Sequence, residues 1–75
     1  MGTYAKTIRS ALRYARAHRR RADRLTNAAV YCIMHGLPDG HTENLYYAEI
    51  EKRMSARCYR RAINVLHAEV TDAER

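Results

Sequence analysis

The chain has 75 residues, enough for one small domain, and its 14 Lys and Arg residues outnumber its 8 Asp and Glu residues. Two cysteines are too few for a disulfide framework, and no apolar run approaches the roughly 18 residues that a transmembrane helix needs. These features exclude a disulfide-rich scaffold and a membrane-spanning protein. We expect a single cytoplasmic domain, residues 1–75, that has no contact with a membrane.

The first predicted element is a helix over residues 4–35. Small or apolar residues recur along it at alternating spacings of four and three, which is typical of helices that pack side by side. This alanine seam consists of Tyr4, Ile8, Ala11, Ala15, His18, Ala22, Leu25, Ala29 and Cys32. Within it, His18 is expected to be hydrogen-bonded. Because alanine-rich faces bury little area in so short a chain, the seam also predicts a loosely held homodimer.

The same helix carries a row of cations almost opposite the seam. The row, called the arginine stripe below, consists of Lys6, Arg9, Arg13, Arg16, Arg20 and Arg24. At about 100° per residue these positions fall within a face roughly 80° wide, and at about 1.5 Å rise per residue they extend over about 27 Å. Arg19 and Arg21 flank the stripe.

The arginine stripe lies in a half of the chain that has few acids. Residues 1–40 contain eight Lys or Arg and only Asp23 and Asp39, whereas residues 41–75 contain six charges of each sign. Like charges four residues apart cost about 0.2–0.5 kcal/mol each, so a face of this kind indicates an anionic partner rather than simple solvation. Arginine also exceeds lysine by seven to one in this half, which favours bidentate contact with phosphate or carboxylate.

A turn is predicted over residues 36–42, and a second helical region follows it. Gly36 stands where a left-handed conformation ends a helix, Pro38 follows, and Thr42 could cap the next helix. Two apolar faces then occur in succession. The first contains Tyr47, Ile50 and Met54, and the second contains Tyr59, Ala62, Ile63, Leu66 and Val70.

The shift between these two faces predicts a break near Ser55, with helices over 43–54 and 55–72. One continuous helix with two buried faces remains the alternative. The expected fold is therefore all-α, with a long N-terminal helix in an antiparallel helical hairpin or a small three-helix arrangement.

The second half contains a further basic cluster and a pair of adjacent tyrosines. Arg57, Arg60, Arg61 and Asn64 share one helical face, and folding back at residues 38–40 would bring them beside residues 17–21. Tyr46 and Tyr47 are adjacent, so one helical face cannot easily bury both rings. We expect one ring to be exposed and to form the centre of a protein-docking surface with Arg53 and Arg57 at its rim.

Chemistry-bearing motifs are missing from the sequence. Neither cysteine stands in a nucleophile–base pattern, no glycine-rich phosphate loop occurs, and Cys32, His35 and His41 lack the spacing of a zinc site. We therefore expect no enzyme activity, no catalytic residues, no metal and no cofactor. The sequence favours a small basic protein that binds the phosphate backbone of DNA or RNA with low sequence specificity. The alternative is a virus- or plasmid-type inhibitor or adaptor that docks on an acidic protein surface.

Overall fold

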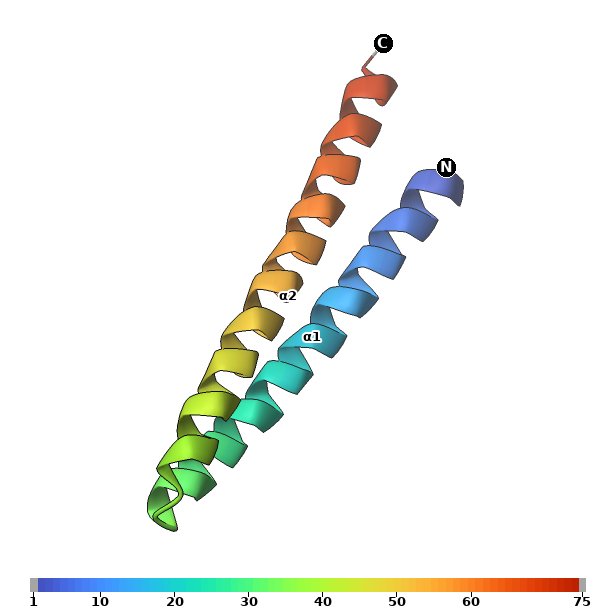
Figure 1. Cartoon of the computed structure of the whole chain (residues 1–75). Coiled ribbons are helices and arrows are strands. Elements are labelled where there is room, and N and C mark those ends of the chain that lie inside the picture. The colour runs from blue at the N-terminus through green and yellow to red at the C-terminus, as the bar shows by residue number, and fades with distance from the viewer. Residues whose placement is uncertain (1, 75) are drawn as a thin grey trace.

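The structure, a computed structural model, describes residues 2–74, with side chains from Tyr4 onward. Helix α1 spans Gly2–Met34 and helix α2 spans Pro38–Ala73. The two helices run antiparallel as a rod of 60 × 15 × 11 Å, with the turn at one end and both chain ends at the other (Figure 1). The described range contains no strand. The prediction of an all-α helical hairpin is confirmed, and the three-helix arrangement is wrong.

The end of α1 follows the predicted stop signal. Gly36 has a φ of 71°, the left-handed conformation that glycine adopts without a steric penalty. The amide of Leu37 bonds the carbonyl of Cys32 at 2.8 Å, and the amide of Gly36 bonds the carbonyl of Ile33 at 3.4 Å. This pair of bonds is the Schellman arrangement that ends many helices. The three residues 35–37 therefore suffice to reverse the chain.

Helix α2 begins earlier than predicted, at Pro38 instead of residue 43. Proline suits the first helical position, because its fixed φ is already helical and its missing N–H would have no partner there. The residue before it, Leu37, makes no side-chain cap, and Thr42 lies inside the helix with its hydroxyl bonded to the Pro38 carbonyl at 3.2 Å. The predicted cap at Thr42 is therefore wrong, as is the turn over 36–42.

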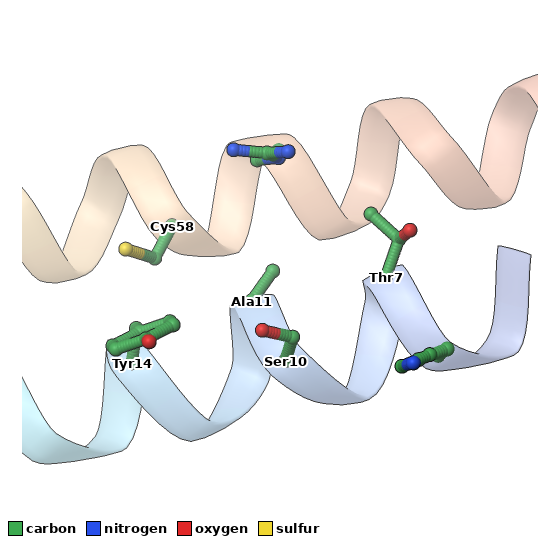
Figure 2. A pocket seen from close by; sticks show the side chains of 7 residues that line it. Thr7, Ser10, Ala11, Tyr14 and Cys58 are labelled. Carbon is green, nitrogen blue, oxygen red and sulfur yellow. The ribbon is translucent and has the colours of Figure 1, made fainter. Parts of the chain in front are cut away.

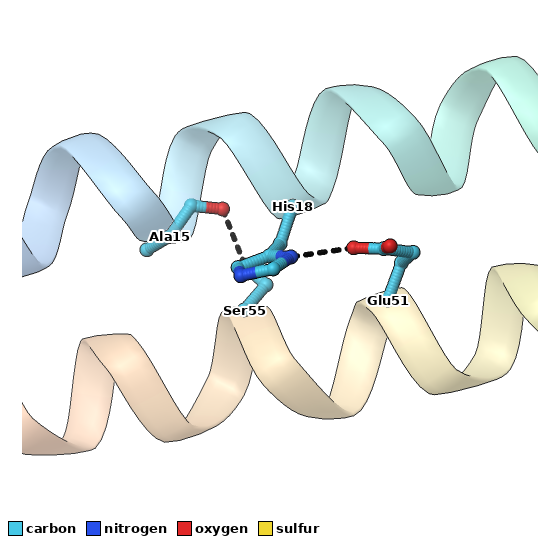
Figure 3. Close-up of polar contacts among 4 residues, drawn as sticks. All are labelled: Ala15, His18, Glu51 and Ser55. Atoms are coloured by element: carbon cyan, nitrogen blue, oxygen red, sulfur yellow. Dashed lines mark hydrogen bonds and ion pairs between the residues drawn. The ribbon is translucent and has the colours of Figure 1, made fainter.

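The predicted break near Ser55 is also absent, since α2 is continuous across this residue. Ser55 is buried, and its hydroxyl donates a hydrogen bond of 2.8 Å to the carbonyl oxygen of Ala15 on α1 (Figure 3). The hydroxyl thus links the two helices and does not act as a helix cap.

The core between the helices consists of small side chains. The buried residues are Ala11, Ala15, Ala22, Ala29, Ala48, Ser55 and Ala62. The four alanines of the seam are therefore buried and its other residues half-buried, and the partner of the seam is α2 of the same chain. A homodimer formed through this seam is excluded, because the surface is already covered.

The face of α2 that contacts α1 differs from the one predicted. Tyr47, Met54, Tyr59, Ile63, Leu66 and Val70 were expected to be buried, and all are between 40% and 64% exposed. Helices that meet through alanine and serine approach closely and leave no room for large side chains between them. The large residues of α2 therefore lie beside the contact or on its outer surface.

Candidate nucleic-acid interface

The arginine stripe lies on the outer face of α1. All six of its residues are exposed, whereas Ala11, Ala15, Ala22 and Ala29 on the opposite face are buried. One uninterrupted helix carries the whole stripe from Lys6 to Arg24. The predicted relation between stripe and seam is thus confirmed, and the six cations form a band about 80° wide along one face of the rod.

The stripe has no carboxylate partner within residues 2–74. The ion pairs of arginine in this range are Arg19 with Asp23 at 3.5 Å and Arg53 with Glu49 at 3.9 Å. Both pairs lie within one helix at a spacing of four residues, and neither includes a stripe residue. Arg19 and Arg53 were predicted as binding residues, and the structure gives each of them an acid of its own. The positive charge of the stripe itself is not neutralised by the described side chains.

Shallow hollows follow the stripe between its side chains. One hollow of about 420 Å³ is lined by Arg9, Arg13, Arg16 and Arg20 together with Leu12. Guanidinium groups around an open hollow can each donate two parallel hydrogen bonds to a phosphate or a carboxylate. The stripe therefore offers several equivalent anion positions and no single enclosed pocket.

The second basic cluster joins this surface from α2. Arg57, Arg60, Arg61 and Asn64 are all exposed, and they line one hollow together with Tyr4 and Val65. Arg61 also lines a hollow of about 300 Å³ between the helices, and Lys6 lines the same hollow from α1. Lys6 thus connects the stripe to the α2 cluster around one side of the rod.

The register of this junction differs from the predicted one. Arg61 and Cys58 share their hollow with Ser10 and Tyr14, whereas residues 57–61 were expected beside residues 17–21. The cause is the position of the turn: the chain reverses around Gly36, so each α2 residue lies several positions nearer the N-terminus of α1 than a turn at 38–40 would give.

Hydroxyl groups in this hollow were missed by the sequence analysis. Figure 2 shows Thr7, Ser10 and Tyr14 spread along α1, with Cys58 on the α2 side of the same hollow. A hydroxyl can donate to an anion that two cations already attract. The sequence did contain a signal for these hydroxyls. Ser10 and Tyr14 are four residues apart and share a helical face that lies between the arginine stripe and the alanine seam.

The aromatic pair on α2 is fully on the surface. Tyr46 is 64% exposed and Tyr47 is 48% exposed, so both rings are accessible where only one was expected. Their centroids lie 5.4 Å apart in an edge-to-face arrangement. The end of the rod near the turn exposes further large apolar residues, namely Val30, Tyr31, Ile33, Met34, Leu37 and Leu45.

The remaining polar contacts hold the hairpin together. His18 Nδ1 lies 2.5 Å from Glu51 Oε2, one helix turn from the bond between Ser55 and Ala15, as Figure 3 shows. The hydrogen bond predicted for His18 is therefore confirmed. Near the chain ends, the hydroxyl of Tyr4 donates to the carboxylate of Asp72, and this bond, aided by the negative charge of Asp72, raises the pKa of Tyr4 above 10.0.

Comparison with protein families, with curated proteins and with solved structures gives no match. Neither helix of the described chain is apolar over a stretch long enough to cross a membrane. The same residues contain no group of three His, Cys, Asp or Glu side chains that could hold a metal ion. The geometry and charge of the basic surface are therefore the evidence from which a function can be argued.

Proposed function

We propose that the protein binds the phosphate backbone of nucleic acid, with low sequence specificity, through the arginine stripe and the α2 cluster of Arg57, Arg60 and Arg61. The observation that carries this proposal is the row of exposed cations along one face of α1, which no described carboxylate neutralises. Such a row lowers its electrostatic free energy most when it meets a regular line of negative charges.

The dimensions of the stripe suit a duplex. A DNA duplex carries one negative charge for about every 1.7 Å of its axis, so the roughly 27 Å of the stripe spans about eight base pairs. Contacts to phosphate fix position and give affinity, but they carry no sequence information. The surface offers little for reading base edges beyond Asn64 and the arginines, which supports low specificity.

The cytoplasm is the compartment we propose for this function. Cys32 and Cys58 are both free thiols in the structure. Unpaired cysteines persist in a reducing compartment, where nucleic acid is also available.

Salt dependence of binding tests the proposal. Fluorescence anisotropy with a labelled duplex of about 20 base pairs should show affinity that falls steeply with salt, with a log–log slope near −4 to −5 for about five phosphate contacts. Changing Arg13, Arg16 and Arg20 together to Gln should reduce the slope by about 2 to 3 units and leave the helix content unchanged.

A matched control removes the same charge elsewhere. The triple change of Arg19, Arg21 and Arg53 to Gln also lowers the net charge by three, but it removes two arginines that have acid partners and one that lies beside the stripe. This control should keep most of the salt dependence of binding. Equal losses in both triple variants, or no binding to DNA or RNA at about 50 mM salt, would count against a phosphate-binding stripe.

A second candidate function has its own observation, the exposed rings of Tyr46 and Tyr47. An inhibitor or adaptor that docks on an acidic surface of a target protein needs an apolar centre beside its cations. Tyr46 lies seven residues before Arg53 and therefore on the same face of α2. Such a protein would use this face of α2 in place of the arginine stripe.

A further inference from the structure

The outer surface of α2 carries a second apolar face with no partner in the chain. Tyr59, Ile63, Leu66 and Val70 are 40%, 64%, 51% and 48% exposed. Their spacings of four, three and four match those of a coiled-coil seam, and Ala56 and Ala73 extend the same pattern by one position at each end. These six residues are called the α2 apolar face below.

The hairpin has little other apolar burial. Its buried residues are six alanines and Ser55, and no large side chain from residues 4–74 is fully buried. A chain of this size has marginal stability even with a larger core. A partner on the α2 apolar face would bury large apolar side chains, which the contact between α1 and α2 lacks.

The charges on α2 are divided along its length. Residues 52–61 contain Lys52, Arg53, Arg57, Arg60 and Arg61 and no acid. Residues 62–74 contain Glu69, Asp72 and Glu74 and neither Lys nor Arg. The α2 apolar face therefore runs from a basic segment into an acidic one.

We propose that a second copy of this chain covers the α2 apolar face, with the two α2 helices antiparallel. In this orientation the basic segment of each copy lies beside the acidic segment of the other. In a parallel pair the basic segments of the two copies would lie side by side, with Lys52 and Arg60 of each nearest the shared face, and like charges across an interface disfavour that partner. Charge complementarity thus selects both the occupant and its direction.

The heptad pattern also sets the register. Antiparallel packing brings Ile63 opposite Leu66 of the partner subunit, and Tyr59 opposite Val70 of the partner subunit. Ala56 then meets Ala73 of the partner subunit at each end. Each of these pairs consists of residues that the monomer exposes. The two copies are related by two-fold symmetry, and every apolar residue of this face is covered.

The area available indicates a weak dimer. The four large side chains expose on the order of 350 Å² per chain, so two copies bury about 700 Å² from them, below the roughly 1,200 Å² at which stable interfaces begin. The flanking stems of Lys52 and Arg60 add to this area. We therefore expect a dimer at micromolar concentrations that dissociates on dilution.

The dimer leaves most of the basic surface free, and of the α2 cluster only Arg60 flanks the interface. Arg61 and Asn64 lie about 100–160° around α2 from Ile63, and the arginine stripe lies on the other helix. The proposal does not depend on nucleic-acid binding, and each would survive the failure of the other.

Sedimentation equilibrium between about 5 and 500 µM tests the interface. The wild-type chain should dimerise, and the double variant Ile63→Gln/Leu66→Gln should raise the dissociation constant at least tenfold. Both residues are exposed in the monomer, so the variant should keep its helical circular dichroism. The matched control, Ile33→Gln/Met34→Gln, changes residues that are 54% and 76% exposed at the other end of the rod and should dimerise like the wild type.

A distance measurement tests the direction. A spin label on Glu74→Cys, in a chain with Cys32→Ser and Cys58→Ser, should give a distance of about 28 Å between the two labels, because residue 74 and its counterpart are about 19 helical positions apart in this register. A distance near 10 Å would show parallel helices and overturn the proposal. A monomer throughout the concentration range, or a dimer that Ile63→Gln/Leu66→Gln does not weaken, would overturn it as well.

Discussion

The buried hydroxyl of Ser55 bonds the carbonyl oxygen of Ala15, 40 residues away in sequence, at 2.8 Å. Ser55 is 4% exposed and Ala15 is fully buried, so the bond crosses the contact between the helices inside the core. A side chain as short as serine can reach a backbone carbonyl of the facing helix only when the two backbones are close. This bond therefore reports the close approach and fixes the relative position of α1 and α2 along the rod.

Substitutions at Ser55 should distinguish the hydrogen bond from the space it occupies. Ser55→Ala removes one neutral bond and should lower the free energy of unfolding by about 1 kcal/mol or less. Ser55→Leu inserts a large side chain where none fits and should cost about 3 kcal/mol. Urea denaturation at a fixed protein concentration measures both. Similar values for the two variants would contradict a closely packed contact at this level.

The helical regions, and which face of α1 is buried and which exposed, could be predicted from the sequence. The spacing of Ala11, Ala15 and Ala22 predicts a buried stripe, and the arginines opposite it predict an exposed one, because both follow directly from helical periodicity. The end of α1 at Gly36 was also predictable, since few residues other than glycine adopt a φ of 71°.

The buried face of α2 could not be predicted in the same way. Two stripes on this helix have heptad spacing, one with Ala48, Ser55 and Ala62 and the other with Tyr59 and Ile63. Periodicity gives the position of a stripe but does not say which stripe meets the partner. The choice follows from the facing helix: an alanine seam accepts small residues, so the more hydrophobic stripe of α2 is left outside.

Gly40 and Cys32 offer a second test of packing. The effect of Gly40→Ala on stability should change sign when Cys32 is also replaced. A Cβ at Gly40 would lie 2.8 Å from Cys32 Sγ but 3.6 Å from its Cβ. Gly40→Ala should therefore destabilise the wild type by about 1 kcal/mol through the clash with sulfur. In a Cys32→Ala background the same change should stabilise by about 0.5–1 kcal/mol, because alanine is a better helix former than glycine.

Gly36→Ala is the control for this pair. Gly36 has open space around it but a φ of 71°, so alanine should cost about 1 kcal/mol in either background. Thermal or urea denaturation of the single and double variants gives the comparison. A penalty for Gly40→Ala that persists without the sulfur would show that another contact opposes the methyl group.

The contact between Tyr4 and Asp72 predicts a pH dependence at the end of the rod. Its hydrogen bond raises the pKa of Tyr4 above 10.0 in the folded chain. A group whose folded pKa is raised stabilises the fold fully below its unfolded pKa and loses this effect as the pH rises through the folded value. The stability difference between wild type and Tyr4→Phe should therefore persist below pH 10 and shrink above it.

A titration of Tyr4 checks the cause of this shift. Nuclear magnetic resonance of labelled tyrosine should show its pKa returning toward 10.0 in Asp72→Asn and staying raised in Asp39→Asn, because Asp39 lies at the opposite end of α2. A Tyr4 pKa that does not respond to Asp72→Asn would remove the hydrogen bond as its cause.

An alanine scan should separate the two candidate functions by the distribution of its losses. If the arginine stripe follows a line of phosphates, each change from Arg9 to Arg24 should weaken binding by a similar small factor and reduce the salt slope by about 0.9. If a surface of α2 docks on a protein, one or two positions among Tyr46, Tyr47, Arg53 and Arg57 should dominate, at about 2 kcal/mol or more each.

The reason for this difference lies in desolvation. A docking residue that becomes fully buried in an interface loses its water and depends on one specific partner, so its truncation is costly. The stripe residues are exposed from Lys6 to Arg24, and each can exchange one phosphate for the next. The scan is measured against a nucleic-acid duplex and against a target protein isolated from nuclease-treated lysate. Uniform losses along residues 9–24, with none at Tyr46, Tyr47 or Arg53, would reject protein docking. A single dominant position at Tyr46 or Arg57 would reject the phosphate-binding stripe as the main function.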